Sequence, residues 1–202
     1  MNIVAIFASG TGTNAIKLLE ASRGLAHVKV PCLIIDSLKS PLPEIIKKDF
    51  PEVQTYLILP EKELQGAEKK KDHEERIIAV LEKHQVQWIF LAGYMRLIGE
   101  GLLGKFKRII NIHPSLLPQY PGLHSYQRAY EDRIPESGVT LHWVDLGLDT
   151  GPVIMQRKFP RLMNDTLTEF INRGKEIEWE IYPALLKELN DTSSIAGVSY
   201  EQ

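Results

Sequence analysis

The chain of 202 residues contains a single cysteine, Cys32, which lies inside the apolar run Val28–Ile35. One cysteine excludes an intramolecular disulfide and a metal cage built from cysteines, so a buried strand position is its expected role. Long apolar runs are also missing, since none approaches the roughly 18 residues of a membrane span. Because no signal-like segment opens the sequence, we expect a cytoplasmic protein without membrane association.

An excess of charge of one sign is missing as well. The sequence has 24 Lys and Arg against 26 Asp and Glu, a formal net charge of −2. Its densest basic run, Lys69–Lys71, is followed by Asp72 and by Glu74-Glu75, which is typical of a solvated helix face. We therefore expect neither nucleic acid nor an anionic membrane as a partner.

Short, continuous, β-rich apolar runs are present, and they predict strands that are covered on both faces. These runs lie at 3–8, 28–35, 55–59, 88–92 and 108–112, with amphipathic helical patterns at 13–22, 44–48 and 68–84 between them. The alternation predicts an α/β fold: a single-domain, Rossmann-like, mostly parallel twisted sheet with helices on both faces. Ligands of such sheets bind beyond the carboxyl ends of the strands.

The alternation stops at residue 114, because the prolines of the segment 114–122 cannot support a regular helix or strand. Two further β-like runs follow at 138–144 and 152–159, and an amphipathic helix is expected at 166–189. We expect one domain over residues 1–189, with halves at about 1–100 and 101–189, and a polar tail at 190–202.

A glycine-rich loop, SGTGTN at 9–14, joins the first strand to the first helix. Gly10, Gly12 and Ala15 fit the dinucleotide pattern G-x-G-x-x-G/A, and Asp36 follows at the end of the next apolar run. The pattern guarantees only backbone N–H groups and a helix N-terminus that face an anion. The pyrophosphate of NAD and a single sugar phosphate both remain candidates at this point.

Polar side chains gather in two turn-rich segments. Asn111 and His113 flank Ile112 at the end of a strand, so alternation points both to the same side. Asp149 lies in the Gly-flanked turn LGLDTG, from which its carboxylate can approach an imidazole and raise the pKa of that imidazole. The alternatives are local: a strand end bonded to its own backbone, a turn-forming aspartate, and a satisfied strand histidine at His142.

The segment LAGYMRLIG at 91–99 is a third candidate site, because a buried strand there ends in an apolar cluster with one cation. Such a cluster could hold a flat heterocycle, or it could be a loop that packs on the core.

Five motifs together resemble one family. They are IVAIFASGTGTN, LAGYMRLI, INIHPSLLPQYPGLH, HWVDLGLDTGPVI and EIEWEIYP, in family order and spacing over roughly 1–35 and 86–186. The sequence resembles the folate-dependent formyltransferases, and its glycine loop and YPGLH resemble the branch of phosphoribosylglycinamide formyltransferase (GAR transformylase). The resemblance implies transfer of the formyl group of 10-formyltetrahydrofolate to the amine of 5′-phosphoribosylglycinamide in purine biosynthesis. It implies no metal, small-molecule partners only, and a monomer or homodimer.

The resemblance also assigns the site residues, with a nucleotide-binding N-terminal half and a folate-binding, catalytic C-terminal half. Asn111, His113 and Asp149 would be catalytic, with His113 held as an imidazolium by Asp149 and paired with the Asn111 amide at the formyl oxygen. Gly12, Thr13, Asn14 and Glu178 would bind the ribonucleotide, with its single phosphate on the glycine loop. Met95, Arg96, Leu97, Ile98 and Asn111 would bind folate, with Lys70 at the position of a family arginine but without its planar fork.

Between about 36 and 75 the sequence departs from the family pattern. Asp36 follows the second strand where Ser-Asn is usual, and Tyr126 replaces a second histidine after His124. Two alternative functions remain. An NAD(P)-linked reductase would leave Asn111, His113 and Asp149 without a use. A catalytically silent nucleotide-binding scaffold is disfavoured, because nothing structural would require these three residues.

Overall fold

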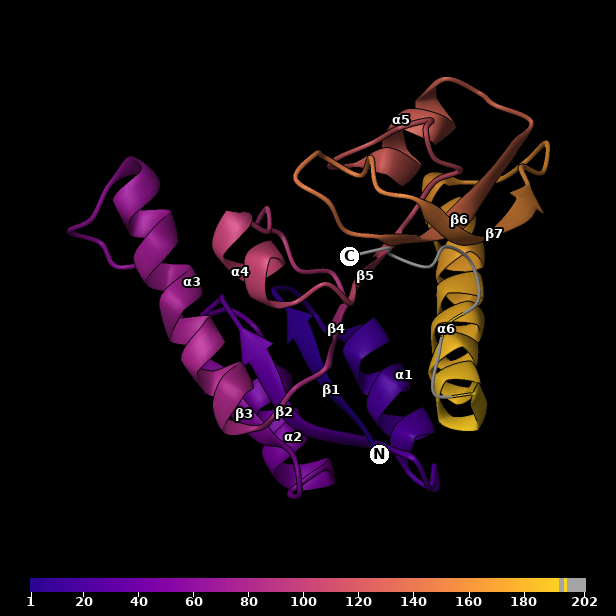
Figure 1. Cartoon of the computed structure of the whole chain (residues 1–202). Coiled ribbons are helices and arrows are strands. Elements are labelled where there is room, and N and C mark those ends of the chain that lie inside the picture. Colours follow the sequence, from indigo (N-terminus) through magenta and orange to yellow (C-terminus); the bar gives the residue numbers. More distant parts are fainter. Residues whose placement is uncertain (193–194, 196–202) are drawn as a thin grey trace.

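A computed structural model describes residues 1–192 and 195. Its centre is one seven-stranded sheet with helices packed against it (Figure 1). The strands are β1 (Asn2–Ala8), β2 (Val28–Ile35), β3 (Gln54–Leu57), β4 (Trp88–Leu91), β5 (Ile109–His113), β6 (Glu136–Trp143) and β7 (Val153–Pro160). Each of the seven predicted runs overlaps one of these strands.

The order of strands across the sheet is β3-β2-β1-β4-β5-β6-β7. The first five strands pair in parallel, whereas β6 runs antiparallel to both β5 and β7. The single-domain, mostly parallel α/β fold expected from the sequence is confirmed. Since β2 lies on one side of β1 and β4 on the other, a topological switch point lies at the carboxyl ends of β1 and β4.

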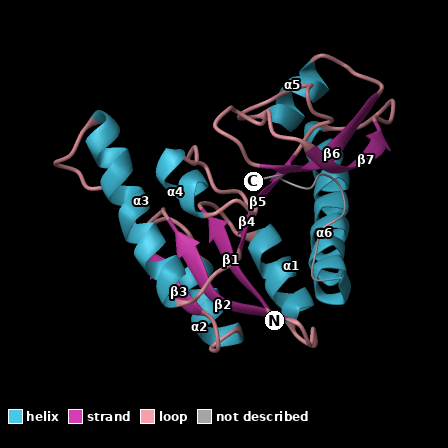
Figure 2. Ribbon diagram, in the orientation of Figure 1, coloured by secondary structure: helices cyan, strands magenta, loops and turns pink. Residues whose placement is uncertain are grey.

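The two faces of the sheet carry separate apolar clusters, because side chains alternate along each strand. Val4 and Ile6 of β1 belong to one cluster, and Ala5 and Phe7 belong to the other. The first cluster is covered by α1 (Thr13–Ser22), α2 (Leu42–Asp49) and α6 (Leu167–Thr192), and the second by α3 (Gly66–Lys83) and α4 (Glu100–Lys105). Figure 2 shows these helices around the sheet, with α1 and α6 side by side.

Three features of the helices differ from the sequence-based prediction. The helix α4 was not predicted because it is short and its start is held by Glu74 of α3, which is distant in sequence. The short helix α5 (Ser125–Glu131) follows the proline-rich segment and packs against β7 and α6. The helix α6 continues to Thr192, beyond the predicted end at 189. Residues 193–194 and 196–202 of the predicted tail lie outside the described residues.

The loops that follow β1 and β4 are tied to each other at the switch point. The Ser9 amide donates to the Gly93 carbonyl at 3.2 Å, and the Ser9 hydroxyl accepts from the Met95 amide at 2.9 Å. The glycine loop and the segment 91–99 are therefore neighbours at one edge of the sheet. Among the residues that the structure describes, no helix is long and apolar enough to cross a membrane.

Candidate active site

Two functional side chains are placed by the carboxyl end of β5. Asn111 and His113 alternate with Ile112 along this strand, and Pro114 follows at once. Asn111 pairs across the sheet with His142 of β6, and His113 pairs with Thr140. The prediction that Asn111 and His113 share a side is confirmed, because both contact the carboxylate of Asp149.

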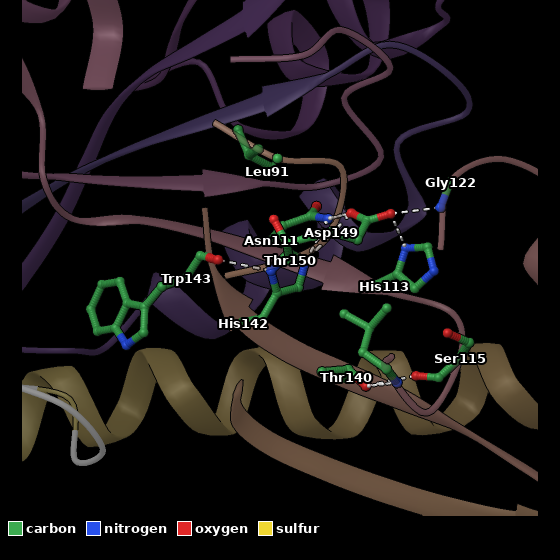
Figure 3. Close-up of polar contacts among 12 residues, drawn as sticks. Leu91, Asn111, His113, Ser115, Gly122, Thr140, His142, Trp143, Asp149 and Thr150 are labelled. Carbon is green, nitrogen blue, oxygen red and sulfur yellow. Dashed lines mark hydrogen bonds and ion pairs between the residues drawn. The ribbon is translucent and has the colours of Figure 1, made fainter. Parts of the chain in front are cut away.

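Asp149 lies between the strands β6 and β7 and joins several segments of the chain (Figure 3). Its Oδ2 atom accepts from the Gly122 amide at 2.7 Å and lies 3.2 Å from His113 Nδ1. Its Oδ1 atom lies 3.4 Å from Asn111 Nδ2 and 3.6 Å from His142 Nε2. The residue adopts a positive φ of 55°, and such strain persists only where surrounding contacts fix the backbone.

His142 orients the amide of Asn111. Its Nδ1 atom donates to the Trp143 carbonyl at 2.8 Å, which leaves Nε2 to accept from Asn111 Nδ2 at 3.1 Å. The second N–H of the same amide points to Asp149 at the longer distance of 3.4 Å. His142 is therefore part of the site rather than an unrelated strand histidine.

The carboxylate of Asp149 is stabilised in its ionised form. Burial raises the pKa of Asp149, but the contact with His142, the hydrogen bond from the Gly122 amide and the neighbouring His113 imidazole lower it, and the net shift is downward. Asp149 is therefore an acceptor at neutral pH.

The charge of His113 differs from the prediction. Its Nε2 atom donates to the Tyr120 carbonyl at 2.9 Å and lies 3.1 Å from the Ser125 hydroxyl, while Nδ1 faces Asp149. Acceptors on both nitrogens favour the imidazolium, yet burial has the larger effect and holds the pKa of His113 below its usual value of 6.5. Asp149 raises the pKa of this imidazole, as expected, but burial lowers it more, so the net shift is opposite to the expected one.

The proline-rich segment is held beside these side chains by hydrogen bonds to β6. Thr140 donates to the Ser115 carbonyl at 2.7 Å and accepts from the Leu117 amide at 3.1 Å (Figure 3). The Ser125 hydroxyl donates to the Gly122 carbonyl at 2.8 Å. These bonds fix the Gly122 amide opposite Asp149.

One cavity of about 520 Å³ brings the predicted site residues together. Asn111, His113 and Asp149 line it, together with Asn14 and Glu178. The lining further includes Leu91, Gly93, Tyr94, Met95, Arg96, Leu97, Ile98, Ile112, Pro114, Gly122, Leu123, His124, His142, Val144, Asp145, Gly147 and Leu148. Hydrogen-bonding groups for a polar reaction centre thus share one space with an apolar wall.

Comparison with known proteins identifies the family to which this chain belongs. The sequence profile described as Formyl transferase matches residues 1–186. The chain belongs to the formyl transferase family. It is 35% identical to the phosphoribosylglycinamide formyltransferase of Bacillus subtilis over 195 residues, which is 94% of this chain and 95% of that relative.

Solved structures of the family share the same fold. The phosphoribosylglycinamide formyltransferase of Bacillus halodurans matches with a TM-score of 0.87 and 36% identity, over 98% of this chain and 100% of that one. The enzyme of Streptococcus pneumoniae matches with a TM-score of 0.84 and 38% identity, over 94% and 99%. The resemblance seen in the sequence is confirmed.

In this formyl transferase the expected phosphate loop lies at the start of α1. Gly12 has a φ of 75°, and a Cβ there would overlap the side chain of Leu42, so both backbone and packing require glycine. Of the three loop residues predicted to bind phosphate, Asn14 lines the cavity, whereas Gly12 and Thr13 are not among the described lining residues.

The residues predicted to bind folate form one wall of the cavity. Met95 and Leu97 are exposed there. Leu123 and Leu148, from two other segments that line the cavity, are also exposed, and the four side chains give the cavity an apolar rim. The guanidinium of Arg96 is paired with buried Asp36 at 2.5 Å. Asp36, which departs from the family pattern, neutralises this cation.

Lys70 lies apart from the cavity that holds Asn111, His113 and Asp149. It lines an adjoining cavity of about 390 Å³ that shares Met95, Arg96, Leu97 and Ile98 with the first. The structure therefore brings Lys70 beside the apolar wall but away from Asn111, His113 and Asp149.

Several groups of the site were missed by reasoning from the sequence. The Tyr120 carbonyl and the Gly122 amide are backbone atoms, which no side-chain pattern reveals. Ser125 and Tyr126 begin a helix that was not predicted, so their direction was unknown. The pairing of Asn111 with His142 depends on the antiparallel register of β5 and β6, which only the structure gives.

Proposed function

We propose that this chain transfers the formyl group of 10-formyltetrahydrofolate to the amine of 5′-phosphoribosylglycinamide, giving formylglycinamide ribonucleotide and tetrahydrofolate in purine biosynthesis. Family membership supports this reaction, and the observation that carries it is the convergence of Asn111, His113 and Asp149 on one cavity with Asn14, Glu178 and the apolar wall. The NAD(P) reading leaves the three polar side chains unused.

The reaction forms a bond from the substrate amine to the formyl carbon and breaks the bond from that carbon to N10 of the folate. The amine loses a proton and N10 gains one. The folate supplies the formyl group, and the residues of the cavity must stabilise negative charge on the formyl oxygen and move the proton. Asp149, which is ionised and lines the cavity, would accept the amine proton through a water.

Asn111 and His113 are the donors to the formyl oxygen in this proposal. His142 holds the Asn111 amide, and the weaker 3.4 Å contact with Asp149 leaves one N–H for the substrate. Preorganised donors of this kind each contribute about 10²- to 10³-fold in rate. The His113 N–H, bonded to Tyr120 in the unliganded site, exchanges its acceptor for the formyl oxygen.

The protonation of His113 follows the reaction in this proposal. Burial lowers the pKa of His113 in the empty site, which favours the neutral imidazole. Negative charge that develops on the formyl oxygen raises the pKa of His113, since an opposite charge favours the ionised form. The imidazole thus becomes charged as negative charge develops on the formyl oxygen, and it need not be charged before the reaction.

Binding of the two substrates uses opposite features of the cavity. We assign the nucleotide to the start of α1 with Gly12, Thr13, Asn14 and Glu178, and its phosphate to the backbone N–H groups there. We assign the pterin to the wall at 95–98, and Lys70 to the outer end of the folate. The cytoplasmic location and the monomer or homodimer remain predictions.

A spectrophotometric assay with both substrates, which follows deformylated folate, tests the proposal. His113→Ala should lower kcat by at least about 10²-fold because it removes a donor to the developing charge, while nucleotide binding stays within about threefold. His84→Ala, at the end of α3 and bonded to Tyr56, is the matched control. An inactive wild type that binds NAD(P)H would contradict the proposal, and unchanged turnover of His113→Ala would contradict the assigned role.

A further inference from the structure

The carboxylate of Glu178 is held by two hydrogen bonds at the cavity. It is 8% exposed and lies on α6. Its Oε1 atom accepts from the Tyr126 hydroxyl at 2.6 Å, and its Oε2 atom accepts from Asn14 Nδ2 at 2.6 Å. Hydrogen bonds of this length to a buried carboxylate fix its orientation firmly.

This corner of the cavity presents hydrogen-bond acceptors with unused capacity. Asn14 is 9% exposed, and its Oδ1 atom is buried without a hydrogen-bond partner among the described residues. Each oxygen of Glu178 also has accepting capacity beyond the one bond that it receives. A buried acceptor without a partner is costly, so a ligand group that donates, a hydroxyl or an amine, fits this corner.

The fold makes room for the phenol of Tyr126. A Cβ atom at residue 174 of α6 would overlap the Tyr126 hydroxyl, so Gly174 is required there. The ring also packs against Phe159 and Phe170, in the latter case edge to face. Glycine inside a helix is unfavourable, and at residue 174 it leaves room for the phenol hydroxyl, which donates to Glu178.

Tyr126 is also adjacent to the reaction centre along the chain. The hydroxyl of the preceding residue, Ser125, lies 3.1 Å from His113 Nε2. The first turn of α5 therefore touches the catalytic imidazole through one residue and Glu178 through the next. This turn sets the distance between the reacting centre and the acceptor corner.

We infer that Tyr126 is a positioning residue for the ribonucleotide: it holds the Glu178 carboxylate beside Asn14 as an acceptor pair for the hydroxyl or amine groups of the substrate. The inference rests on the proposed function, since it takes 5′-phosphoribosylglycinamide as the ligand. Tyr126 contacts no reacting atom, so its removal affects recognition of the nucleotide more than the chemical step.

Tyr126→Phe tests the inference, because it removes one oxygen and keeps the ring. The KM for 5′-phosphoribosylglycinamide should rise about tenfold or more, as expected for a lost hydrogen bond to a charged group. The KM for the folate and kcat should change by less than about threefold. Tyr130→Phe is the matched control on the same helix, since its hydroxyl donates at 2.7 Å to the Asp165 carbonyl, away from the cavity.

A pH profile separates positioning from a general loss of structure. Burial raises the pKa of Glu178, while the bonds from Tyr126 and Asn14 and the charge of Lys175 lower it. Without the phenol donor the pKa of Glu178 rises further. The acid limb of kcat/KM for the nucleotide should therefore move to higher pH in Tyr126→Phe and stay in place in Tyr130→Phe.

A second variant tests whether the effect of Tyr126→Phe comes from the position of the phenol hydroxyl. Gly174→Ala displaces the phenol hydroxyl and should reproduce the selective rise in nucleotide KM. If Tyr126→Phe matches Tyr130→Phe in KM and pH profile, or if both substrates lose affinity equally, the inference is wrong while the proposed function stands. A wild type without formyl transfer would overturn both.

Discussion

Asp149 contacts groups from three separate parts of the chain. Its neighbours are the Gly122 amide in the proline-rich segment, Asn111 and His113 on β5, and His142 on β6. A residue of this kind has two effects at once. It keeps the two donors at their positions, and its charge acts on both imidazoles.

Asp149→Asn should lower kcat by about 10²- to 10³-fold, because it removes the proton acceptor and weakens the arrangement of both donors. The carboxylate raises the pKa of His113 against the effect of burial, so its removal lowers that pKa further. The titration of His113, followed by NMR, should therefore shift to lower pH. Asp72→Asn, on the outer face of α3, controls for the loss of one negative charge; an unshifted or upward-shifted titration of His113 in Asp149→Asn would contradict the assignment.

At the scale of elements, the apolar wall at 95–98 ends at Gly99, whose amide is held by a carboxylate of another helix. Glu74 of α3 is buried and accepts from the Gly99 amide at 2.5 Å and from the Leu102 amide at 3.3 Å. It thereby satisfies amides at the start of α4, as a capping residue would. Because α4 follows the wall directly, this contact also fixes one end of the wall to which we assign the pterin.

Glu74→Ala should lower the free energy of unfolding by about 2 kcal/mol, since it leaves buried amides without an acceptor. Urea unfolding measures the loss. Glu75→Ala is the matched control, because Glu75 is exposed and its 3.9 Å contact with Lys71 contributes little. Equal stability of the two variants would show that Glu74 does not cap α4.

Some features of the site could be predicted from the sequence, and others could not. Residues at strand ends, such as Asn111 and His113, could be assigned to one side because alternation along a strand is regular. The roles of His142 and Tyr126 could not be assigned, because they depend on cross-strand register and on a short helix after irregular chain. The effect of Asp149 on the pKa of His113 was predicted in the right direction, but the larger, opposite effect of burial was not, since burial cannot be measured along a sequence.

At the scale of the whole molecule, two buried histidines link stability to pH. Burial is the main cause that lowers the pKa of His73 and also of His113. In the unfolded chain both groups titrate near 6.5. Below that pH the unfolded state binds protons that the folded state does not, so stability falls as the pH falls through this range.

The urea midpoint should accordingly decrease when the pH is lowered from 8 to about 5.5, and His73→Gln should show a smaller decrease. His27→Gln, an exposed position, should retain the slope of the wild type. Fluorescence-detected unfolding at several pH values measures these slopes. A slope in His73→Gln as steep as in the wild type would contradict the linkage.

The apolar rim of the cavity has a consequence for handling the protein. Met95, Leu97, Leu123 and Leu148 are more than half exposed in the absence of substrate, and surfaces of this kind promote self-association. With the pterin at this wall, as proposed, a folate analogue would cover the same side chains that two colliding molecules would bury. Concentrated solutions should thus stay clear longer with such an analogue present, and turbidity becomes a simple report on whether the pocket is filled.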